Sequence, residues 1–592
     1  MVWEPELAER ARRAELAAQL GGPEKVARQR AAGRLTVRER IDGLLDPGSF
    51  REIGGLAGRG TYDENGELTD FSPVNLVVGT GRIDGRKIVV RADDFTVRGG
   101  SADAGNLAKT AYPEQLAHEM RHPLVRLIEG SGGGGSVKML EDHGFTYVPV
   151  NPGWDHVVAN LSTVPVVSAC VGPVAGLGAA LAVTSHLTLL VDKTAQLFVA
   201  GPPVVRYATG EDVTKEELGG ASIHRRSGAV DLVVSSEIAA FAAVRAFLSY
   251  LPTSVYHLPP VIEGTDDPDR REESLVSLVP RDRRQPYKIA PLLDAVFDAG
   301  SVFRYAGFGG SLVTALARLD GHPVGVVATD PYKGATLTAQ GAADALTRLA
   351  DLCETFHLPL VSLTDQSGMV IGTAGERSAA IRHGARAVAA IYQAKVPMAE
   401  VIVRRVFGVG GAGQVNRHRL VRRWAWPSGD WGSLPVEGGL EAAYRAAELE
   451  AAPDRAAERA RILERLDAVR SPFRTAERFG VEDIIDPART RGLLCDWVHD
   501  AYDLLPPLIG PPAFAPDHRN QAMETRPWKP GHGNQAMETR PWKPGHGNQA
   551  METRPWKPDH RNTESRLSGG ECRWWCRHCR GWERSPRLAG CR

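Results

Sequence analysis

The two halves of the chain repeat one pattern at a fixed distance, and this repeat constrains the fold more than any other feature of the sequence. Each matching pair is separated by 236 positions: Asp84-Gly85 and Asp320-Gly321, Ala92 and Ala328, Asp94 and Asp330, Leu124-Val125 and Leu360-Val361, Ser131-Gly132 and Ser367-Gly368. Later segments correspond with a small shift, Val164-Pro165 with Val396-Pro397 and Gly176 with Gly408. Such self-similarity indicates two copies of one structural unit.

Within each copy, strand-like apolar segments alternate with helical segments and short Gly-rich loops. This alternation predicts an α/β fold, with a parallel or mixed sheet covered by helices. A chain of 592 residues also exceeds what one core usually supports. We therefore predict two domains, 1–255 and 256–510, with the boundary in the charged, Pro-rich stretch 252–285, and a tail of residues 511–592.

The N-terminal region shows helical spacing and clear helix ends. Residues 4–32 alternate charged residues with Ala and Leu, which predicts two surface helices broken at Gly21-Gly22-Pro23. Thr36 is expected to cap a further helix that ends at the turn around Pro47.

Composition excludes several classes of protein. With 71 basic and 71 acidic residues, the chain has no general bias toward nucleic acid or membranes. Residues 157–191 carry no formal charge apart from a possible one on His186, so a membrane span has to be considered. Prolines and glycines interrupt this segment, which favours strand, turn, helix and strand in a soluble core. The scarcity of cysteines before residue 510 (Cys170, Cys353 and Cys495) indicates a reduced, cytoplasmic compartment.

The tail differs from the rest of the chain. A 14-residue unit occurs three times, at 520–533, 534–547 and 548–561, and its composition predicts disorder. A zinc site is conceivable in the last segment, but its spacing matches no standard pair of CxxC knuckles, and appended repetitive sequence is the alternative. The candidate ligands are Cys572, Cys576, His578, Cys579 and Cys591.

Two glycine clusters are the candidate chemical groups. The apolar strand 396–403 leads to Gly408-Val409-Gly410-Gly411-Ala412, and the apolar strand 124–128 leads to the loop 131–136. Backbone N–H groups at such positions can hold a negatively charged oxygen. Nucleophilic side chains are less favoured, because there is no Gly-x-Ser-x-Gly elbow, Cys170 and Cys353 lie in apolar runs, and His383 fits a packed or capping role better than that of a base.

Several long motifs, in order along residues 25–505, resemble the carboxyltransferase (beta) subunits of biotin-dependent acyl-CoA carboxylases. They include the stretch 33–50, Asp94-Phe95-Thr96-Val97-Arg98-Gly99-Gly100-Ser101, the stretch 201–221, Gln285-Pro286-Tyr287 and Ile381-Arg382-His383-Gly384-Ala385. The resemblance implies two tandem crotonase-like (ClpP-like) domains. It also implies that the first domain binds acyl-CoA and that the second domain of a neighbouring subunit receives carboxybiotin, in a dimeric unit commonly stacked into a hexamer.

The resemblance also assigns roles to residues. Gly132, Gly133 and Gly134 would hold the thioester oxygen, and Gly411 and Ala412 the ureido oxygen of biotin. Gly410, Gly368 and Gly176 would contribute to the binding of the cofactor, and Gln414 falls where the family tunes acyl-chain size. The sequence departs from the family at Arg377-Ser378-Ala379-Ala380 and at Gly413-Gln414, so the usual rule for substrate size does not apply. No metal ligand is predicted in this site.

The function that follows is carboxyl transfer from carboxybiotin to the α carbon of a short-chain acyl-CoA such as propionyl-CoA. The chain has no biotin-attachment Ala-Met-Lys-Met and no ATP-binding loop, so the biotin carrier and the biotin carboxylase are expected to be partner polypeptides. Two alternatives stay open: a decarboxylase or transcarboxylase subunit with the same fold, and a non-catalytic scaffold whose tail recruits a partner.

Overall fold

The computed structural model describes residues 2–513 apart from 134–136, 138–139, 142–143, 265, 418, 420 and 444–450. The described residues belong to one compact unit, which contains both copies of the repeat. The three predicted domain ranges stay predictions, and the 14-residue repeats and the cysteine-rich segment lie outside the described residues. Among the helices of the described part, none has the length and apolar character needed to cross a membrane.

The first copy builds a mixed sheet of eight strands in the order β1-β4-β5-β6-β7-β8-β10, with β9 beside β7. Strands β1, β4 and β5 are antiparallel, and the strands from β5 to β10 are parallel. Their bounds are β1 Arg51–Ile53, β4 Leu76–Ile83, β5 Arg86–Asp93, β6 Leu124–Gly130, β7 Val166–Ala175, β8 Leu187–Val191, β9 Gln196–Phe198 and β10 Leu232–Val234.

The second copy builds the same sheet again, in the order β11-β12-β13-β14-β15-β16-β18, with β17 beside β15. Directions also match, since β11 to β13 are antiparallel and the remaining pairs are parallel. The bounds are β11 Phe303–Tyr305, β12 Leu312–Leu319, β13 His322–Thr329, β14 Leu360–Gln366, β15 Met398–Phe407, β16 Val421–Ala425, β17 Asp430–Gly432 and β18 Asp483–Ile484. The predicted pair of α/β units is confirmed.

The repeat extends to backbone details. Asp84 and Asp320 have positive φ angles of 49° and 45°, and Arg121 and His357, which cap equivalent helices, have 54° and 60°. Non-glycine residues rarely adopt such angles, so their recurrence at the same spacing reflects one shared backbone path.

The N-terminal helices begin and end where the sequence predicts. Helices α1 (Glu4–Ala18) and α2 (Pro23–Ala31) flank the Gly21-Gly22 break. Helix α3 (Val37–Leu44) starts at a capping box, in which the Thr36 hydroxyl accepts from Glu39 N and the Glu39 carboxylate accepts from Thr36 N. The uncharged segment forms β7, α7 (Leu177–Val183) and β8, so the predicted strand, helix and strand are confirmed.

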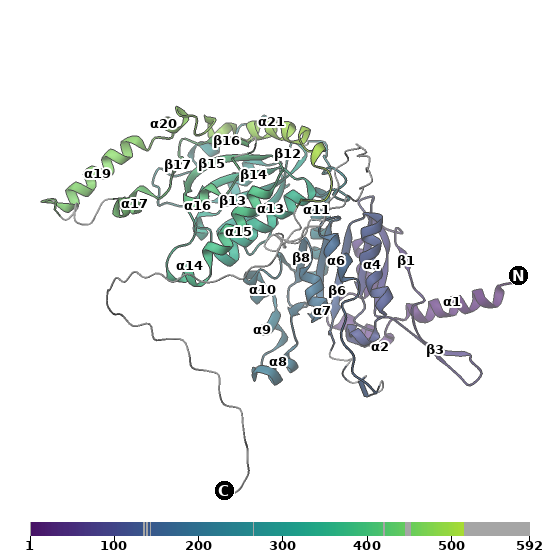
Figure 1. Cartoon of the computed structure of the whole chain (residues 1–592). Coiled ribbons are helices and arrows are strands. Elements are labelled where there is room, and N and C mark those ends of the chain that lie inside the picture. The colour runs from purple at the N-terminus through teal and green to yellow at the C-terminus, as the bar shows by residue number, and fades with distance from the viewer. Residues whose placement is uncertain are drawn as a thin grey trace, which may run out of the picture. The chain divides into compact units, whose positions relative to one another are not determined.

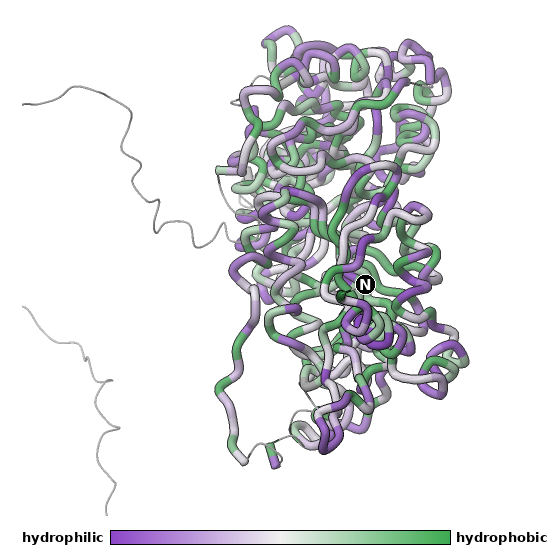
Figure 2. The backbone as a smooth tube through the Cα atoms, turned by 90° about the vertical axis from the view of Figure 1, so that its right-hand side faces the viewer, coloured by the Kyte–Doolittle hydropathy of each residue, from purple (hydrophilic) through white to green (hydrophobic). Residues whose placement is uncertain are grey.

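Helices cover both faces of the second sheet. Helices α13 (Asp344–Phe356) and α15 (Ala380–Gln393) lie on one face, and α21 (Thr490–Asp503) lies on the other (Figure 1). Along the helices, hydrophilic stretches alternate with hydrophobic ones (Figure 2), as expected for helices that bury one face. Burial of these apolar faces against the strands supplies the main stabilisation of each layer.

The two copies contact each other through polar groups as well as apolar ones. Arg348 on α13 forms an ion pair of 2.6 Å with Asp231, which precedes β10 of the first sheet. The Tyr305 hydroxyl on β11 donates to the backbone oxygen of His186 at 2.8 Å. These contacts fix the orientation of one sheet against the other within the chain.

Candidate active site

In the first copy, a glycine turn follows the central strand β6. Gly132 has φ +71° and accepts a hydrogen bond from Ala102 N at 3.2 Å. A Cβ atom at Gly132 would lie 3.0 Å from the Ala175 oxygen, at the end of β7. The turn therefore rests directly on the end of the next strand, where only a residue without a side chain fits. Gly133 continues the turn, and Gly134 lies outside the described residues.

The second copy repeats this arrangement after β14. Gly368 has φ +107° and accepts from Leu337 N at 2.8 Å. A Cβ atom at Gly410 would lie 2.9 Å from the carbonyl carbon of Gly368. The structure thus brings the predicted residues Gly368 and Gly410 into contact.

The glycine cluster of the second copy forms a short helix. Strand β15 continues to Phe407, beyond the predicted end at residue 403, and α16 covers Gly408–Ala412 with Phe407 as its N-cap. In an α-helix the first N–H groups have no partner within the helix, whereas later ones bond to the carbonyl four residues back. Gly408, Val409 and Gly410 therefore carry the N–H groups of the first turn, and the predicted Gly411 and Ala412 follow them in the helix.

Two other predicted residues, Gly176 and Gln414, have polar groups that lie against other parts of the chain. The Gly176 N–H donates to the Val199 oxygen at 3.1 Å, just before α7 begins. Gln414 is 1% exposed, with its Oε1 3.5 Å from Ser362 Oγ on β14. Among the described residues its Nε2 has no hydrogen-bond partner. The role of Gln414 in acyl-chain size stays a prediction.

A buried carboxylate lies before each glycine turn, and the sequence analysis missed both. Glu129 in the first copy and Asp365 in the second are 236 positions apart, and each is 0% exposed. Glu129 pairs with Arg34 and, at 2.6 Å, with Arg40. The repeat offset of 236 positions relates the two acids and could have identified them. Only identical residues were matched between the copies, however, and Glu129 and Asp365 differ in identity.

Asp365 is held in the same way by two arginines of β15. Arg405 Nε lies 2.6 Å from its Oδ1, and Arg404 donates to its Oδ2 at 2.9 Å. Burial alone would raise the pKa of Asp365, but the hydrogen bonds and charges of Arg405 and Arg404 outweigh burial and lower it. The carboxylate is therefore ionised at neutral pH and fixes the strand end from which α16 begins.

A basic cavity of about 220 Å³ adjoins the first glycine turn. Its lining combines positive side chains with the backbone of Gly99, whose oxygen accepts from Ser131 N at 3.0 Å. The lining residues are Lys25, Arg28, Gln29, Arg34, Phe95, Thr96, Arg98 and Gly99. Clustered cationic side chains favour the binding of phosphate groups.

The cysteines and His383 are held in packed surroundings. Cys170, Cys353 and Cys495 are free, buried thiols, and burial raises the pKa of Cys170 to about 12. His383 Nδ1 lies 2.8 Å from Asp344 Oδ1, so its ring contacts the neighbouring helix α13. The expectation of packed thiols and a packed histidine is confirmed.

Comparison with known proteins gives a consistent result. The family model described as carboxyl transferase domain matches residues 28–499. The propionyl-CoA carboxylase carboxyltransferase subunit of Haloferax mediterranei is 33% identical over 498 residues, covering 83% of this chain and 95% of that protein. The methylmalonyl-CoA decarboxylase subunit alpha of Veillonella parvula is 31% identical over 485 residues, covering 80% and 91%.

A solved structure agrees in fold. The transcarboxylase 12S hexamer core, solved with methylmalonyl-coenzyme A bound, matches with a TM-score of 0.75 and 28% identity, covering 90% of this chain and 98% of that chain. The predicted crotonase-like fold and the predicted class of enzyme are confirmed. The family model and the similar proteins match most of the chain, and the solved transcarboxylase has the same fold. The chain therefore belongs to the carboxyl transferase family.

Proposed function

We propose that this protein moves a carboxyl group from carboxybiotin on a partner protein to the α carbon of a short-chain acyl-CoA. The observation that carries the proposal is the doubled site: each copy ends its central strand in a glycine turn that rests on the end of the next strand. Enolising a thioester and removing a carboxyl group from biotin each place negative charge on an oxygen. Two sets of backbone donors match these two charges.

In the first copy, Gly132, Gly133 and Gly134 would hold the thioester oxygen. The neighbouring basic cavity supports binding of the CoA part at this turn, because CoA carries phosphate groups and the cavity gathers cationic side chains. The acyl chain would then enter past Ser131, whose N–H is already used by Gly99.

In the second copy, the first turn of α16 would hold the ureido oxygen. Bound carboxybiotin supplies the carboxyl group. Because Gly368 and Gly410 have no side chains, their backbones can lie in contact. This contact fixes α16 beside the Gly368 turn. Among the candidates Gly410, Gly411 and Ala412, we favour Gly410, together with Val409, because the N–H groups of a first helical turn have no partner within the helix.

A charge reversal at Arg28 tests the basic cavity. Arg28→Glu is expected to raise the KM for acyl-CoA about 10-fold, equivalent to about 1.4 kcal/mol, with kcat nearly unchanged, because uniform binding is lost. The effect should shrink at high salt. Arg10→Glu on the exposed face of α1 is the matched control and should leave KM unaltered. If the two variants have the same KM for acyl-CoA, the cavity does not bind the CoA part.

We also propose that the site is completed by a second copy of the chain. Large apolar side chains are exposed in both copies, including Val199, Val204 and Tyr207 in the first copy and Ile371 and Ile381 in the second. Exposed apolar groups of this kind mark interaction surfaces. A homodimer that joins the first copy of one protomer to the second copy of its partner would cover them, and stacking into a hexamer is the larger assembly that we propose.

The remaining proposals concern the domains, the partner proteins and the location in the cell. The ranges 1–255 and 256–510 would be the acyl-CoA and biotin domains, and a biotin carboxylase and a biotin carrier would be the partners. The three buried free thiols support a reduced, cytoplasmic location.

The decisive assay supplies carboxylated biotin carrier and a series of acetyl-, propionyl- and longer acyl-CoA. The expected result is transfer to at least one short acyl-CoA. Failure with every acyl-CoA, for a folded and oligomeric protein, would contradict the proposal.

A decarboxylase or transcarboxylase subunit is the second candidate, favoured by the identity to the Veillonella parvula decarboxylase subunit. Its chemistry uses the same two donor sets in reverse. Carboxyl transfer out of methylmalonyl-CoA that runs without a biotin carboxylase partner would favour this candidate.

Deleting residues 517–592 separates an enzyme from a scaffold. Both donor sets lie before residue 413, so we expect the truncated chain to keep full transfer activity with a carrier supplied. Loss of carboxylation with an intact core would instead show that the tail recruits a partner.

A further inference from the structure

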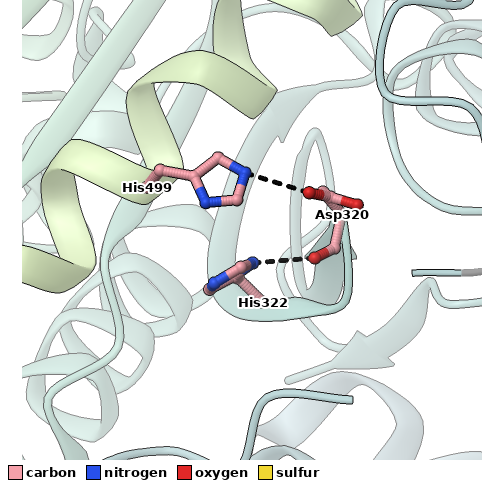
Figure 3. Close-up of side chains that lie close together, drawn as sticks. All are labelled: Asp320, His322 and His499. Carbon is pink, nitrogen blue, oxygen red and sulfur yellow. Dashed lines mark hydrogen bonds and ion pairs between the residues drawn. The ribbon is translucent and has the colours of Figure 1, made fainter. Parts of the chain in front are cut away.

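Three side chains of types that can bind a metal ion lie close together at one end of the second sheet (Figure 3). Asp320 lies in the turn between β12 and β13, His322 begins β13, and His499 lies on α21. Each offers one ligand atom, and these atoms all lie within 4.8 Å of one another. His499 Nε2 is 2.9 Å from Asp320 Oδ2, and His322 Nδ1 is 2.7 Å from the Asp320 backbone oxygen.

The elements that carry these ligands are fixed by a buried ion pair. The carboxylate of Asp298 accepts from Asp320 N at 3.0 Å and from Gly321 N at 2.8 Å. Arg491 on α21 is 1% exposed and donates to the same carboxylate at 2.8 Å. One buried pair therefore holds both the turn of Asp320 and the helix of His499, which is the rigid support that a metal site needs.

In the first copy, an arginine side chain lies at the equivalent turn. The turn Asp84-Gly85 is held by Asp46 in the same manner, with distances of 3.1 and 2.9 Å. There Arg245 on α11 (Glu237–Tyr250) places its guanidinium 2.9 Å from Asp84 Oδ1 and 3.2 Å from Asp46 Oδ1. The first copy thus supplies a built-in positive charge to this turn.

In the second copy, imidazoles stand beside the turn. His322 takes the place of Arg86, at the shared offset of 236, and the side chain that contacts the Asp320 carboxylate is His499. The ring of His322 lies 4.7 Å, centre to centre, from His499 and also 4.7 Å from Tyr502, edge to face in both cases. Packing on two sides fixes the orientation of His322 toward Asp320.

Solvent can reach the cluster. The side chain of His499 is 53% exposed and that of Asp320 is 26% exposed. A metal ion can therefore reach these side chains from solvent and keep some of its water ligands.

We propose that Asp320, His322 and His499 bind one divalent transition-metal ion of the zinc class, with water completing the coordination. Two imidazole nitrogens and one carboxylate oxygen form a donor set that suits Zn²⁺ in a tetrahedral arrangement. The ion joins α21 to the turn between β12 and β13. It does not take part in carboxyl transfer, because His322 begins β13 whereas the glycine turns follow the ends of the parallel strands β14 and β15, at the opposite edge of the sheet.

The test measures Zn²⁺ binding to the full-length chain by equilibrium dialysis, with Cys572, Cys576, Cys579 and Cys591 changed to serine so that the tail thiolates do not contribute. This protein is expected to bind one zinc ion. Asp320→Asn, His322→Ala and His499→Ala should each weaken binding at least about 10-fold, the lower end of the loss seen when a metal site is disturbed. Asn accepts the positive φ of position 320, so the turn is kept.

His257→Ala is the matched control, because His257 is an exposed histidine that contacts Ser254 and lies outside the cluster. It should bind zinc like the parent, and His499→Ala should keep carboxyl-transfer activity. The proposal is overturned if the parent protein binds no zinc, or if the cluster variants bind it as tightly as His257→Ala does.

Discussion

Val409→Pro is expected to reduce carboxyl transfer at least about 100-fold, the typical loss when one donor to a developing oxyanion is removed. Proline has no N–H group, and it is tolerated in the first turn of a helix, where no intrahelical bond is lost. Val409 is 60% exposed and lies in the first turn of α16, so the change removes a donor without opening the core. Steady-state transfer assays would record the loss in kcat.

Val409→Ala is the matched control, because it shortens the same side chain and keeps the N–H group. It should retain most of the activity. Thermal unfolding of both variants shows whether the fold is intact. Full activity of a folded Val409→Pro protein would mean that Gly411 and Ala412, or other groups, hold the oxygen instead.

Arg40→Met is expected to lower the free energy of unfolding of the protein by about 3–5 kcal/mol, as for other buried ion pairs that lose one partner. Arg40 is 1% exposed and lies 2.6 Å from both Glu129 and Glu237. Burial disfavours its charged form, but the two carboxylates outweigh burial and raise its pKa. Its removal leaves two buried negative charges without this partner, and urea unfolding followed by circular dichroism would measure the cost.

Arg38 on the same helix provides the control. It pairs with Glu52 at 2.6 Å with its side chain 35% exposed, and such partly exposed pairs contribute only about 0–1 kcal/mol. Arg38→Met should therefore unfold at nearly the urea concentration of the unaltered protein. If the two arginine variants unfold alike, the buried ion pairs of Arg40 do not stabilise the fold more than the exposed pair of Arg38 does.

Much of the fold follows from the repeat alone. Identical residues such as Asp84-Gly85 and Asp320-Gly321 lie in turns with the same backbone angles, so a constant offset in sequence becomes a constant position in two sheets. The strands are apolar on both faces, as buried parallel strands are, and this made them easy to recognise.

The details of the site were harder to predict. The sequence does not show that β15 continues to Phe407, because Arg404 and Arg405 interrupt its apolar run, and their pairing with Asp365 appears only in the fold. That extension decides which amides begin α16. Likewise, the partners Arg40 and Glu129 are 89 residues apart, and only the folded sheet brings them together.

Complementation between two inactive variants tests the central claim most directly. One chain carries Gly132→Val, which strains the first turn, and the other carries Val409→Pro, which removes a donor from the second. If each site joins the first copy of one protomer to the second copy of its partner, random mixing in a two-fold dimer should restore about a quarter of the activity. Verified mixed oligomers that stay inactive would contradict a site shared between protomers.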